Sequence, residues 1–261
     1  MYIRQADSTN RLLKDMIASA DTPAEALCDG FYIVTDYQTA GRGQVGNHWE
    51  SKDGENLLVS ILIRPQGLEV SKQFRLSMIA SLSVVEALNN TLLPYTGVAG
   101  ATSTSLPLAI KWPNDIYYKE KKLGGILIEN RLKGKEVSDC IFGLGLNINQ
   151  TVFESDAPNP ISIKQITGKE ADRQAVLESI LTRLNERKAW LSDVHYEELK
   201  AAYVNRLYRR EGVFEYEDEG GRFKAQFKDI DEMGRLVLER QKGGKAVRKE
   251  YLFKQIKYVI E

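Results

Sequence analysis

Residues 108–147 read LAIKWPNDIYYKEKKLGGILIENRLKGKEVSDCIFGLGLN, a stretch in which apolar or alternating segments are separated by turn-forming or charged residues. Segments rich in Ile, Val, Leu, Tyr and Phe are typical of β-strands. The predicted strands are Leu108 to Lys111, Asp115 to Tyr118, Leu123 to Glu129 and Val137 to Asn147. Because strands and helices do not alternate regularly, we predict an α+β domain with a mixed or antiparallel sheet, not a parallel doubly wound fold.

Further elements are indicated on both sides of this stretch. β-Branched and aromatic residues predict strands at Phe31 to Thr35 and at Leu57 to Ile63. Apolar residues at helical spacing predict helices, and Ser8 or Thr9 is placed to cap the first of them. The predicted helices cover Asn10 to about Ala20, Phe74 to Val85, Val176 to Leu184 and His195 to Leu207. Residues 98–105 instead indicate a loop of small side chains.

The last part of the sequence changes to short alternating segments. In the clearest of them Phe223, Ala225 and Phe227 alternate with polar residues, as expected for a strand with one buried face. Turn-forming residues separate about four such segments. We therefore predict a large first domain over residues 1–210 and a small antiparallel β-barrel over residues 211–261.

Composition excludes several classes of protein. The chain has 261 residues, with 36 basic and 36 acidic side chains, so charge gives no global reason to expect binding to nucleic acid. Cys28 and Cys140 lie far apart without a CxxC pair, which argues against a disulfide scaffold and a zinc site of usual spacing. No signal peptide and no apolar run long enough to span a bilayer are present. We expect a cytoplasmic protein that binds neither nucleic acid nor membranes.

The segment Gly41 to Trp49 (GRGQVGNHW) satisfies the pattern GxGxxG after a predicted strand. A dinucleotide-binding fingerprint opens a helix, whereas the residues that follow here have no apolar helical stripe, so the Rossmann interpretation fails. Two interpretations are left: a solvated surface loop, or a loop whose backbone N–H groups bind an anion when a ligand orders it. Alone, the segment favours the solvated loop.

Three further segments each allow a structural and a functional interpretation. Pro113 fixes the backbone at a tight bend, where Asn114 and Asp115 either face a cleft or form an ordinary turn. Residues 121–129 (KKLGGILIE) indicate either a ligand-binding hairpin or an exposed hairpin tip with a bulge. The glycines within residues 143–149 mark either a bulge or a strand that a planar ligand approaches closely.

Taken together and in this order, these segments resemble the motifs of the biotin–protein ligase family. The resemblance covers nearly the whole chain and is carried by Asp7 to Asn10, Gln38 to Gly43, Trp49, Lys111 to Asp115, Lys122 to Leu127 and Gly143 to Asn147. It implies a class II synthetase-like biotin/lipoate ligase domain, followed by a C-terminal barrel of the SH3-like kind.

The resemblance implies an enzyme that joins biotin to ATP, giving biotinyl-AMP and pyrophosphate, and then transfers biotin to a lysine of a biotin carboxyl carrier domain. Because two anions must meet, the site needs cations and fixed N–H donors where negative charge builds up. The implied catalytic residues are Lys122, Arg42 and Asp115. The implied biotin contacts are Ser8, Thr9, Asn10, Gln38, Arg42, Gly43, Gln44, Lys122 and Gly125, and the implied adenylate contacts are Gly41, Trp49, Asn114 and Asn147.

The family's roles imply a division of labour among these residues. Lys122 bridges the biotin carboxylate and the α-phosphate, a task that suits a compact ammonium group. Asp115 orients or deprotonates the acceptor lysine, and Trp49 covers the adenylate and excludes water. Mg²⁺ enters with ATP, so we expect no metal site made by the protein itself. A homodimer is left open.

One residue departs from the family's pattern, and three alternatives accompany the resemblance. Gln44 stands where the family often has a second arginine, and the loss of that charge leads us to expect faster escape of biotinyl-AMP. Because the Ser-Thr-Asn motif begins at Ser8, we expect the monofunctional type without an N-terminal helix-turn-helix domain. The alternatives are a lipoate–protein ligase, a lipoyl transferase, and a biotin-binding regulatory protein without catalytic activity.

Overall fold

The structure is a computed structural model that describes residues 1–43, 48–92, 106–154 and 159–260. The helices are α1 (Thr9–Ala18), α2 (Phe74–Leu92), α3 (Ile163–Thr167), α4 (Arg173–Arg187) and α5 (Tyr196–Asn205). The strands are β1 (Tyr2–Ala6), β2 (Tyr32–Gln38), β3 (Leu57–Ile63), β4 (Leu108–Lys111), β5 (Asp115–Tyr118), β6 (Lys121–Lys133), β7 (Glu136–Leu146), β8 (Phe214–Asp218), β9 (Gly221–Ile230), β10 (Leu236–Lys242), β11 (Lys245–Tyr251) and β12 (Lys257–Tyr258). The predicted loop at residues 98–105 lies outside the described residues. No helix in the described ranges is long and apolar enough to cross a membrane.

Seven strands form the main sheet in the order β1-β2-β3-β7-β6-β5-β4. The pair β1–β2 is parallel, and every other neighbouring pair in this sheet is antiparallel. The sheet is therefore mixed, and the predicted α+β fold is confirmed. The predicted strands and helices of the larger domain all appear: the ends of β3, β4 and β5 are as predicted and the ends of the others are shifted, whereas the edge strand β1 and the short helix α3 were not predicted.

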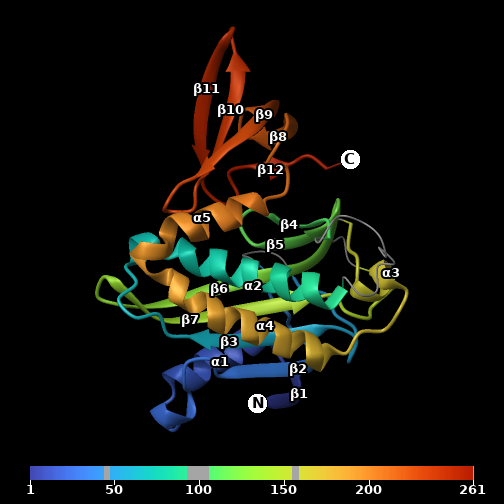
Figure 1. Ribbon diagram of the computed structural model, residues 1–261. Coiled ribbons are helices and arrows are strands. Elements are labelled where there is room, and N and C mark those ends of the chain that lie inside the picture. Colours follow the sequence, from blue (N-terminus) through green and yellow to red (C-terminus); the bar gives the residue numbers. More distant parts are fainter. Residues whose placement is uncertain (44–47, 93–105, 155–158, 261) are drawn as a thin grey trace.

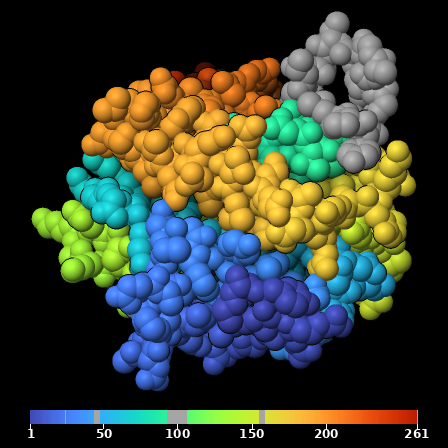
Figure 2. Space-filling view, turned by 60° about the horizontal axis from the view of Figure 1, so that its bottom comes forward, coloured from blue at the N-terminus to red at the C-terminus, as the bar shows by residue number. Residues whose placement is uncertain are grey.

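Helices cover both faces of this sheet, which explains why every residue of β3 is buried. Leu57, Val59 and Ile61 belong to the larger core with α2, and α4 and α5 pack on the outside of α2. Leu62 points to the other face and joins a smaller apolar cluster with Leu13 of α1. Figure 2 shows the N-terminal residues, in blue, spread below the yellow and orange residues of the helical layer. The alternation of side chains along a strand produces these two cores.

The C-terminal module, residues 211–260, is a second sheet in the order β11-β10-β9-β8-β12. All of its neighbouring strands are antiparallel. In the part of the chain that the structure describes, no pair joins the end strands β11 and β12, so this sheet is open. The predicted antiparallel strands are confirmed, but the closed SH3-like barrel is not. Figure 1 shows the module above the main sheet, with β10 and β11 extending farthest from it.

The turn between β9 and β10 fastens the module to the larger domain. The indole Nε1 of Trp112 donates to the backbone oxygen of Gly234 at 2.9 Å. Gly234 has a φ of +84°, and a Cβ there would lie 2.3 Å from the ring of Phe74. Beside it, Nη2 of Arg75, a side chain only 2% exposed, pairs with Oε1 of Glu232 at 2.6 Å. Beyond β11, residues of the module that include those of β12 line a cavity between the module and the larger domain.

Candidate active site

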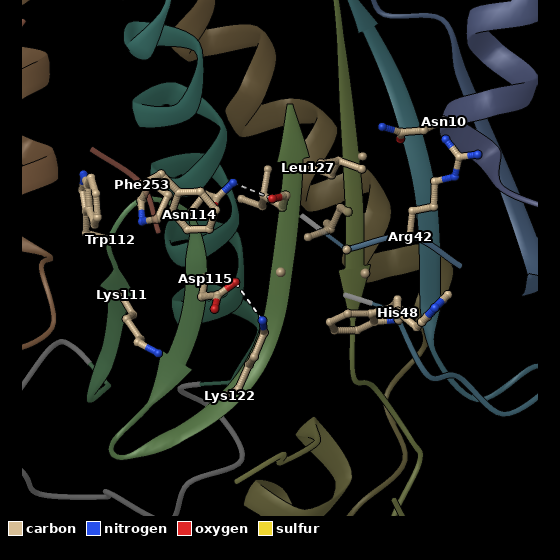
Figure 3. A pocket seen from close by; sticks show the side chains of 18 of the residues that line it. Asn10, Arg42, His48, Lys111, Trp112, Asn114, Asp115, Lys122, Leu127 and Phe253 are labelled. Atoms are coloured by element: carbon tan, nitrogen blue, oxygen red, sulfur yellow. Dashed lines mark hydrogen bonds and ion pairs between the residues drawn. The ribbon is translucent and has the colours of Figure 1, made fainter. Parts of the chain in front are cut away.

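A cavity of about 610 Å³ lies where the start of α1, the strands β4 to β7 and the C-terminal module meet. Most of the predicted site residues line it, namely Ser8, Thr9, Asn10, Gln38, Arg42, Gly43, Trp49, Asn114, Asp115, Lys122 and Gly125. Figure 3 shows Lys111, Asp115 and Lys122 on one side of this cavity and Asn10 and Arg42 on the other. Segments distant in the sequence therefore face one another across a single space.

Lys122 and Asp115 form an ion pair inside this cavity, with Nζ and Oδ1 2.8 Å apart (Figure 3). The backbone of Lys122 is held on both sides, because its N–H donates to Asn159 O at 2.8 Å and its carbonyl accepts from Ile161 N at 2.9 Å. A Cβ at Gly125 would lie 3.4 Å from both charged atoms, so a larger residue there would press on the pair. These contacts contradict the interpretation of Lys122 as part of an exposed hairpin tip.

The bend that precedes Asp115 is as tight as the proline predicted. The peptide bond between Trp112 and Pro113 is cis, and β4 and β5 run antiparallel on either side of the bend. The side chain of Asn114 is 5% exposed and its Nδ2 donates to the backbone oxygen of Ile126 at 2.5 Å. Asn114 thus ties the bend to β6 and still lines the cavity.

The described lining is strongly biased toward positive charge. Its basic residues are Arg42, Lys111, Lys122, Lys254 and Lys257, and among the described lining residues Asp115 is the one carboxylate. Lys111 lies over the rings of Tyr117 and Tyr258, and burial lowers the pKa of its ammonium group. A cavity with this balance of charges favours a ligand that carries several negative charges.

Trp49 lies directly against the backbone of β7. A Cβ at Gly145 would be 2.4 Å from Cε2 of Trp49, so only glycine allows the indole to lie this close. The ring is 6.0 Å from Nζ of Lys122, and the Trp49 backbone N–H donates to Gly41 O at 3.1 Å. The predicted close approach at the glycines of β7 is thus real, although the planar group here is the protein's own tryptophan. The buried Nε1 of Trp49 has no hydrogen-bond partner among the described residues.

A polar cluster forms the end of the cavity near α1. The Thr9 backbone N–H donates to Oε1 of Gln38 at 2.8 Å, and Nδ2 of Asn10 donates to Oε2 of Glu129 at 2.8 Å. Ser60, fully buried on β3, contacts both Thr9 and Asn10. A Cβ at Gly143 would lie 2.1 Å from Oδ1 of Asn10, so the glycine makes room for the amide.

Two predicted contact residues, Gly41 and Asn147, are not among the described residues that line the cavity. Gly41 is buried, and Asn147 donates its Nδ2 to the backbone oxygen of Ile161 at 3.1 Å. Gln44 lies outside the described residues. Arg42 is exposed at the cavity wall and is bridged through its backbone to His48. The ligand contacts assigned to these four residues stay predictions, as do those assigned to the predicted residues that line the cavity.

The C-terminal module supplies a wall of the cavity, and the sequence did not mark the residues that form it. Its contributions are Phe253, Lys254, Ile256, Lys257 and Tyr258. The rings of Phe253 and Trp112 are 6.3 Å apart between centroids, which continues the contact across the two domains. Nothing in the short segment after β11 marks it as part of a site, because its partners are more distant in the sequence than any motif spans. The described residues contain no group of His, Cys, Asp and Glu side chains that could hold a metal ion.

Comparison with known proteins gives concordant results at the level of sequence and of structure. Residues 2–147 match the model of the biotin/lipoate A/B protein ligase family. The chain is 28% identical to the bifunctional ligase/repressor BirA of Bacillus spizizenii, over 90% of this chain and 71% of that protein. It is 26% identical to the biotin–(acetyl-CoA-carboxylase) ligase of Paracoccus denitrificans, over 94% and 96% of the two chains. The biotin protein ligase of Aquifex aeolicus, solved with biotin and ATP, superposes with a TM-score of 0.75 at 26% identity and covers 99% of this chain and 98% of that one.

Proposed function

Because the chain belongs to the biotin/lipoate A/B protein ligase family, we propose that it is a biotin–protein ligase. It joins biotin to ATP, giving biotinyl-AMP and pyrophosphate, and then transfers the biotinyl group to a lysine of an acceptor protein. The observation that carries this proposal is the Lys122–Asp115 pair in a cavity that is rich in cations and has a polar cluster at its far end. The names of the relatives from Paracoccus and Aquifex support the choice of biotin over lipoate.

In the first step the carboxylate of biotin attacks the α-phosphate of ATP and pyrophosphate leaves. The like charges of these groups oppose their approach, and a cation between them offsets that repulsion. Lys122 has the position for this task, since its ammonium lies inside the cavity and its backbone is fixed by Asn159 and Ile161. Lys111, Lys254 and Lys257 add positive charge on the side away from α1, where a polyphosphate can be accommodated.

In the second step the amine of the acceptor lysine attacks the acyl carbon of biotinyl-AMP, AMP leaves, and the amine loses a proton. Asp115 is the carboxylate of the described lining that can orient this amine and accept the proton. Its ion pair with Lys122 holds its side chain inside the cavity, where the amine must arrive. Trp49 covers the cavity beside β7 and limits the access of water, which would otherwise hydrolyse the anhydride.

Several finer features rest on the sequence and on the names of relatives. Mg²⁺ would enter with the phosphates of ATP and neutralise part of their charge, and Asp115 is the carboxylate of the described lining nearest to that chemistry. The acceptor is a biotin carboxyl carrier domain, in line with the carboxylase in the name of the Paracoccus relative. The SH3-like character of the C-terminal module, the cytoplasmic location and the open question of a homodimer stay at the level of sequence prediction.

The test is to incubate the protein with ATP and either biotin or lipoate, and to follow pyrophosphate release. We expect pyrophosphate release with ATP and biotin but not with ATP and lipoate, and we expect Lys122→Ala to abolish the release. Lys121→Ala is the matched control, since Lys121 is the exposed neighbour of Lys122 on the same strand. Release driven by lipoate would identify the alternative enzyme, and biotin binding without release would identify a regulatory protein. An undiminished rate in Lys122→Ala would remove the catalytic assignment.

A further inference from the structure

A chain of hydrogen bonds runs from outside the cavity to its polar end. Oε2 of Glu129, on β6, accepts from Nδ2 of Asn10 at 2.8 Å. On the other side of that amide, Oγ of Ser60 lies 2.5 Å from Oδ1 of Asn10 and 2.7 Å from Oγ1 of Thr9. Thr9 and Asn10 line the cavity, whereas Glu129 and Ser60 do not. Glu129 and Ser60 can therefore act on a ligand in the cavity only through Thr9 and Asn10.

The carboxylate of Glu129, at one end of this series of hydrogen bonds, determines which group donates and which accepts at each step. A carboxylate only accepts hydrogen bonds, so Asn10 must turn its Nδ2 group toward Glu129 and its Oδ1 toward Ser60. The opposite orientation of the amide would place two acceptors 2.8 Å apart. Ser60 has one hydroxyl hydrogen, and it goes to Oδ1 of Asn10, which has none to give.

It follows that Thr9 is the donor in its contact with Ser60. Thr9 has a single hydroxyl hydrogen, and its distance to Ser60, 2.7 Å, is shorter than its 3.2 Å distance to Oε1 of Gln38. That Gln38 oxygen is already used by the Thr9 backbone N–H at 2.8 Å. The lone pairs of Thr9 Oγ1 are then left for a ligand, and the Nε2 end of Gln38 is left to donate.

We propose that Glu129 is a positioning residue that selects the substrate, because it makes Thr9 an acceptor toward the cavity. An acceptor at Thr9 next to a donor at Gln38 complements an N–H next to a C=O, which is the edge of a cyclic urea. Lipoate has no N–H in its ring, so it would leave the Thr9 acceptor without a hydrogen bond. Because a buried polar group without a partner is costly in free energy, lipoate should bind much more weakly than biotin. This inference rests on the proposed function and explains the choice between biotin and lipoate.

The first experiment measures biotin binding by calorimetry without ATP, together with the KM values of both substrates. In Glu129→Gln we expect the Kd and the KM for biotin to rise about tenfold, because a neutral acceptor holds the amide of Asn10 more weakly than a charged one. The KM for ATP should not change. Glu136→Gln is the matched control, since it removes the same charge from an exposed residue of the same hairpin.

A second measurement distinguishes a change in hydrogen-bond direction at Thr9 from a general destabilisation of the site. A biotin analogue methylated at a ureido nitrogen cannot donate to Thr9, so the wild type should bind it much more weakly than biotin. In Glu129→Gln the direction of the hydrogen bonds is no longer fixed. We therefore expect the ratio of the affinity for biotin to the affinity for the methylated analogue to fall several-fold. An unchanged ratio would overturn the proposal.

An exchange of the two partners keeps the proposal testable if Glu129→Gln folds poorly. Asn10→Asp alone sets two carboxylates against each other, and it should weaken biotin binding and lower the melting temperature. Adding Glu129→Gln places an amide donor opposite the new carboxylate and should recover most of the affinity. Additive losses in the double variant would contradict the inference. If the wild type binds biotin and the exchange fails, only the inference is wrong; if the wild type binds no biotin, the proposed function fails with it.

Discussion

Single residues determine how closely groups can approach β7. Gly143 admits the amide of Asn10 and Gly145 admits the ring of Trp49, and in both places a Cβ would overlap the neighbouring side chain. A substitution at either glycine would therefore move a residue of the cavity wall without removing any functional group. This makes the two positions useful for testing what the walls do.

Gly145→Ala should displace Trp49 and open the cavity to water. We expect biotinyl-AMP to be released about tenfold faster and the KM for ATP to rise, because the added methyl group overlaps Cε2 of the indole, 2.4 Å away. Release of preformed biotinyl-AMP in a stopped-flow experiment measures the first effect. Trp49→Ala should release the intermediate as fast, and the double variant no faster. A wild-type rate in Gly145→Ala would show that Trp49 does not retain the intermediate.

Gln44 tests retention of the intermediate by charge. Gln44→Arg restores the arginine that the family often carries there, and we expect it to slow the escape of biotinyl-AMP several-fold, since charge-assisted bonds are about twice as strong as neutral ones. The same stopped-flow measurement applies, with Gln44→Lys as a test of charge without the guanidinium fork. Equal escape rates in the wild type and in Gln44→Arg would refute the idea.

The residues that the sequence revealed are those in short motifs, such as Thr9, Asp115 and Lys122. Ser60 and Glu129 gave no signal, because Ser60 is a single hydroxyl in an apolar strand and Glu129 ends a motif in which only earlier residues were assigned roles. Both reach Asn10 only through the order of the strands, which puts β3 beside β7 and β7 beside β6. Polar groups that support a site from behind are set by tertiary structure, so spacing does not predict them.

At the scale of elements, strands and helices with strong patterns were predicted and weak ones were not. The continuous apolar run of β3 predicts a strand, and its burial on both faces reflects α1 and α2 on opposite sides of the sheet. β1, with the sequence YIRQA, has neither alternation nor an apolar run, because it lies at the edge of the sheet and is largely exposed. Its parallel pairing with β2 and the openness of the second sheet depend on partners that a local pattern does not contain.

Glu239 joins three strands of the C-terminal module, and it gives their stability a dependence on pH. Hydrogen bonds from Lys228, Arg248 and Gln226 lower the pKa of Glu239 from 4.5 to about 2. A carboxylate whose folded pKa is depressed stabilises the fold above its unfolded value, and that contribution is lost as the pH falls from 4.5 toward 2.

Glu239→Gln should therefore lower the melting temperature by a few degrees at pH 7, and by progressively less as the pH falls below 4.5. Thermal melts followed by circular dichroism across this range measure the difference. Added salt should reduce it at pH 7, since charges near the surface are screened. Glu219→Gln is the control, because the Glu219 side chain is 91% exposed. A difference that is constant with pH would show that the carboxylate contributes only through packing.

At the scale of the whole molecule, the cavity depends on how the C-terminal module is attached. Arg75 of α2 is 2% exposed and pairs with Asp193 before α5 and with Glu232 of the module. Its guanidinium also lies 4.6 Å above the ring of Tyr196. One buried cation thus holds two segments of the larger domain and the turn of the module in a fixed relation.

Arg75→Met should loosen this attachment while keeping an apolar side chain in the core. We expect a melting temperature lower by several degrees, faster proteolysis between Tyr208 and Phe214, and a KM for ATP raised several-fold, because removing one member of a buried ion pair leaves the others unsatisfied. Limited proteolysis and steady-state kinetics measure these effects. Arg183→Met, which removes an exposed pair within α4, is the control. An unchanged KM for ATP would separate the attachment of the module from the site.

The walls of the cavity include residues as far apart in the sequence as Ser8 and Tyr258. During translation the ribosome delivers the first of these residues long before the last, so a nascent chain cannot bind nucleotide in the finished way until Tyr258 has emerged. A premature stop codon just after β11 would leave every recognisable motif in the gene product and still remove one wall of the cavity. The sequence of such a product would still predict a ligase, although its site would be incomplete.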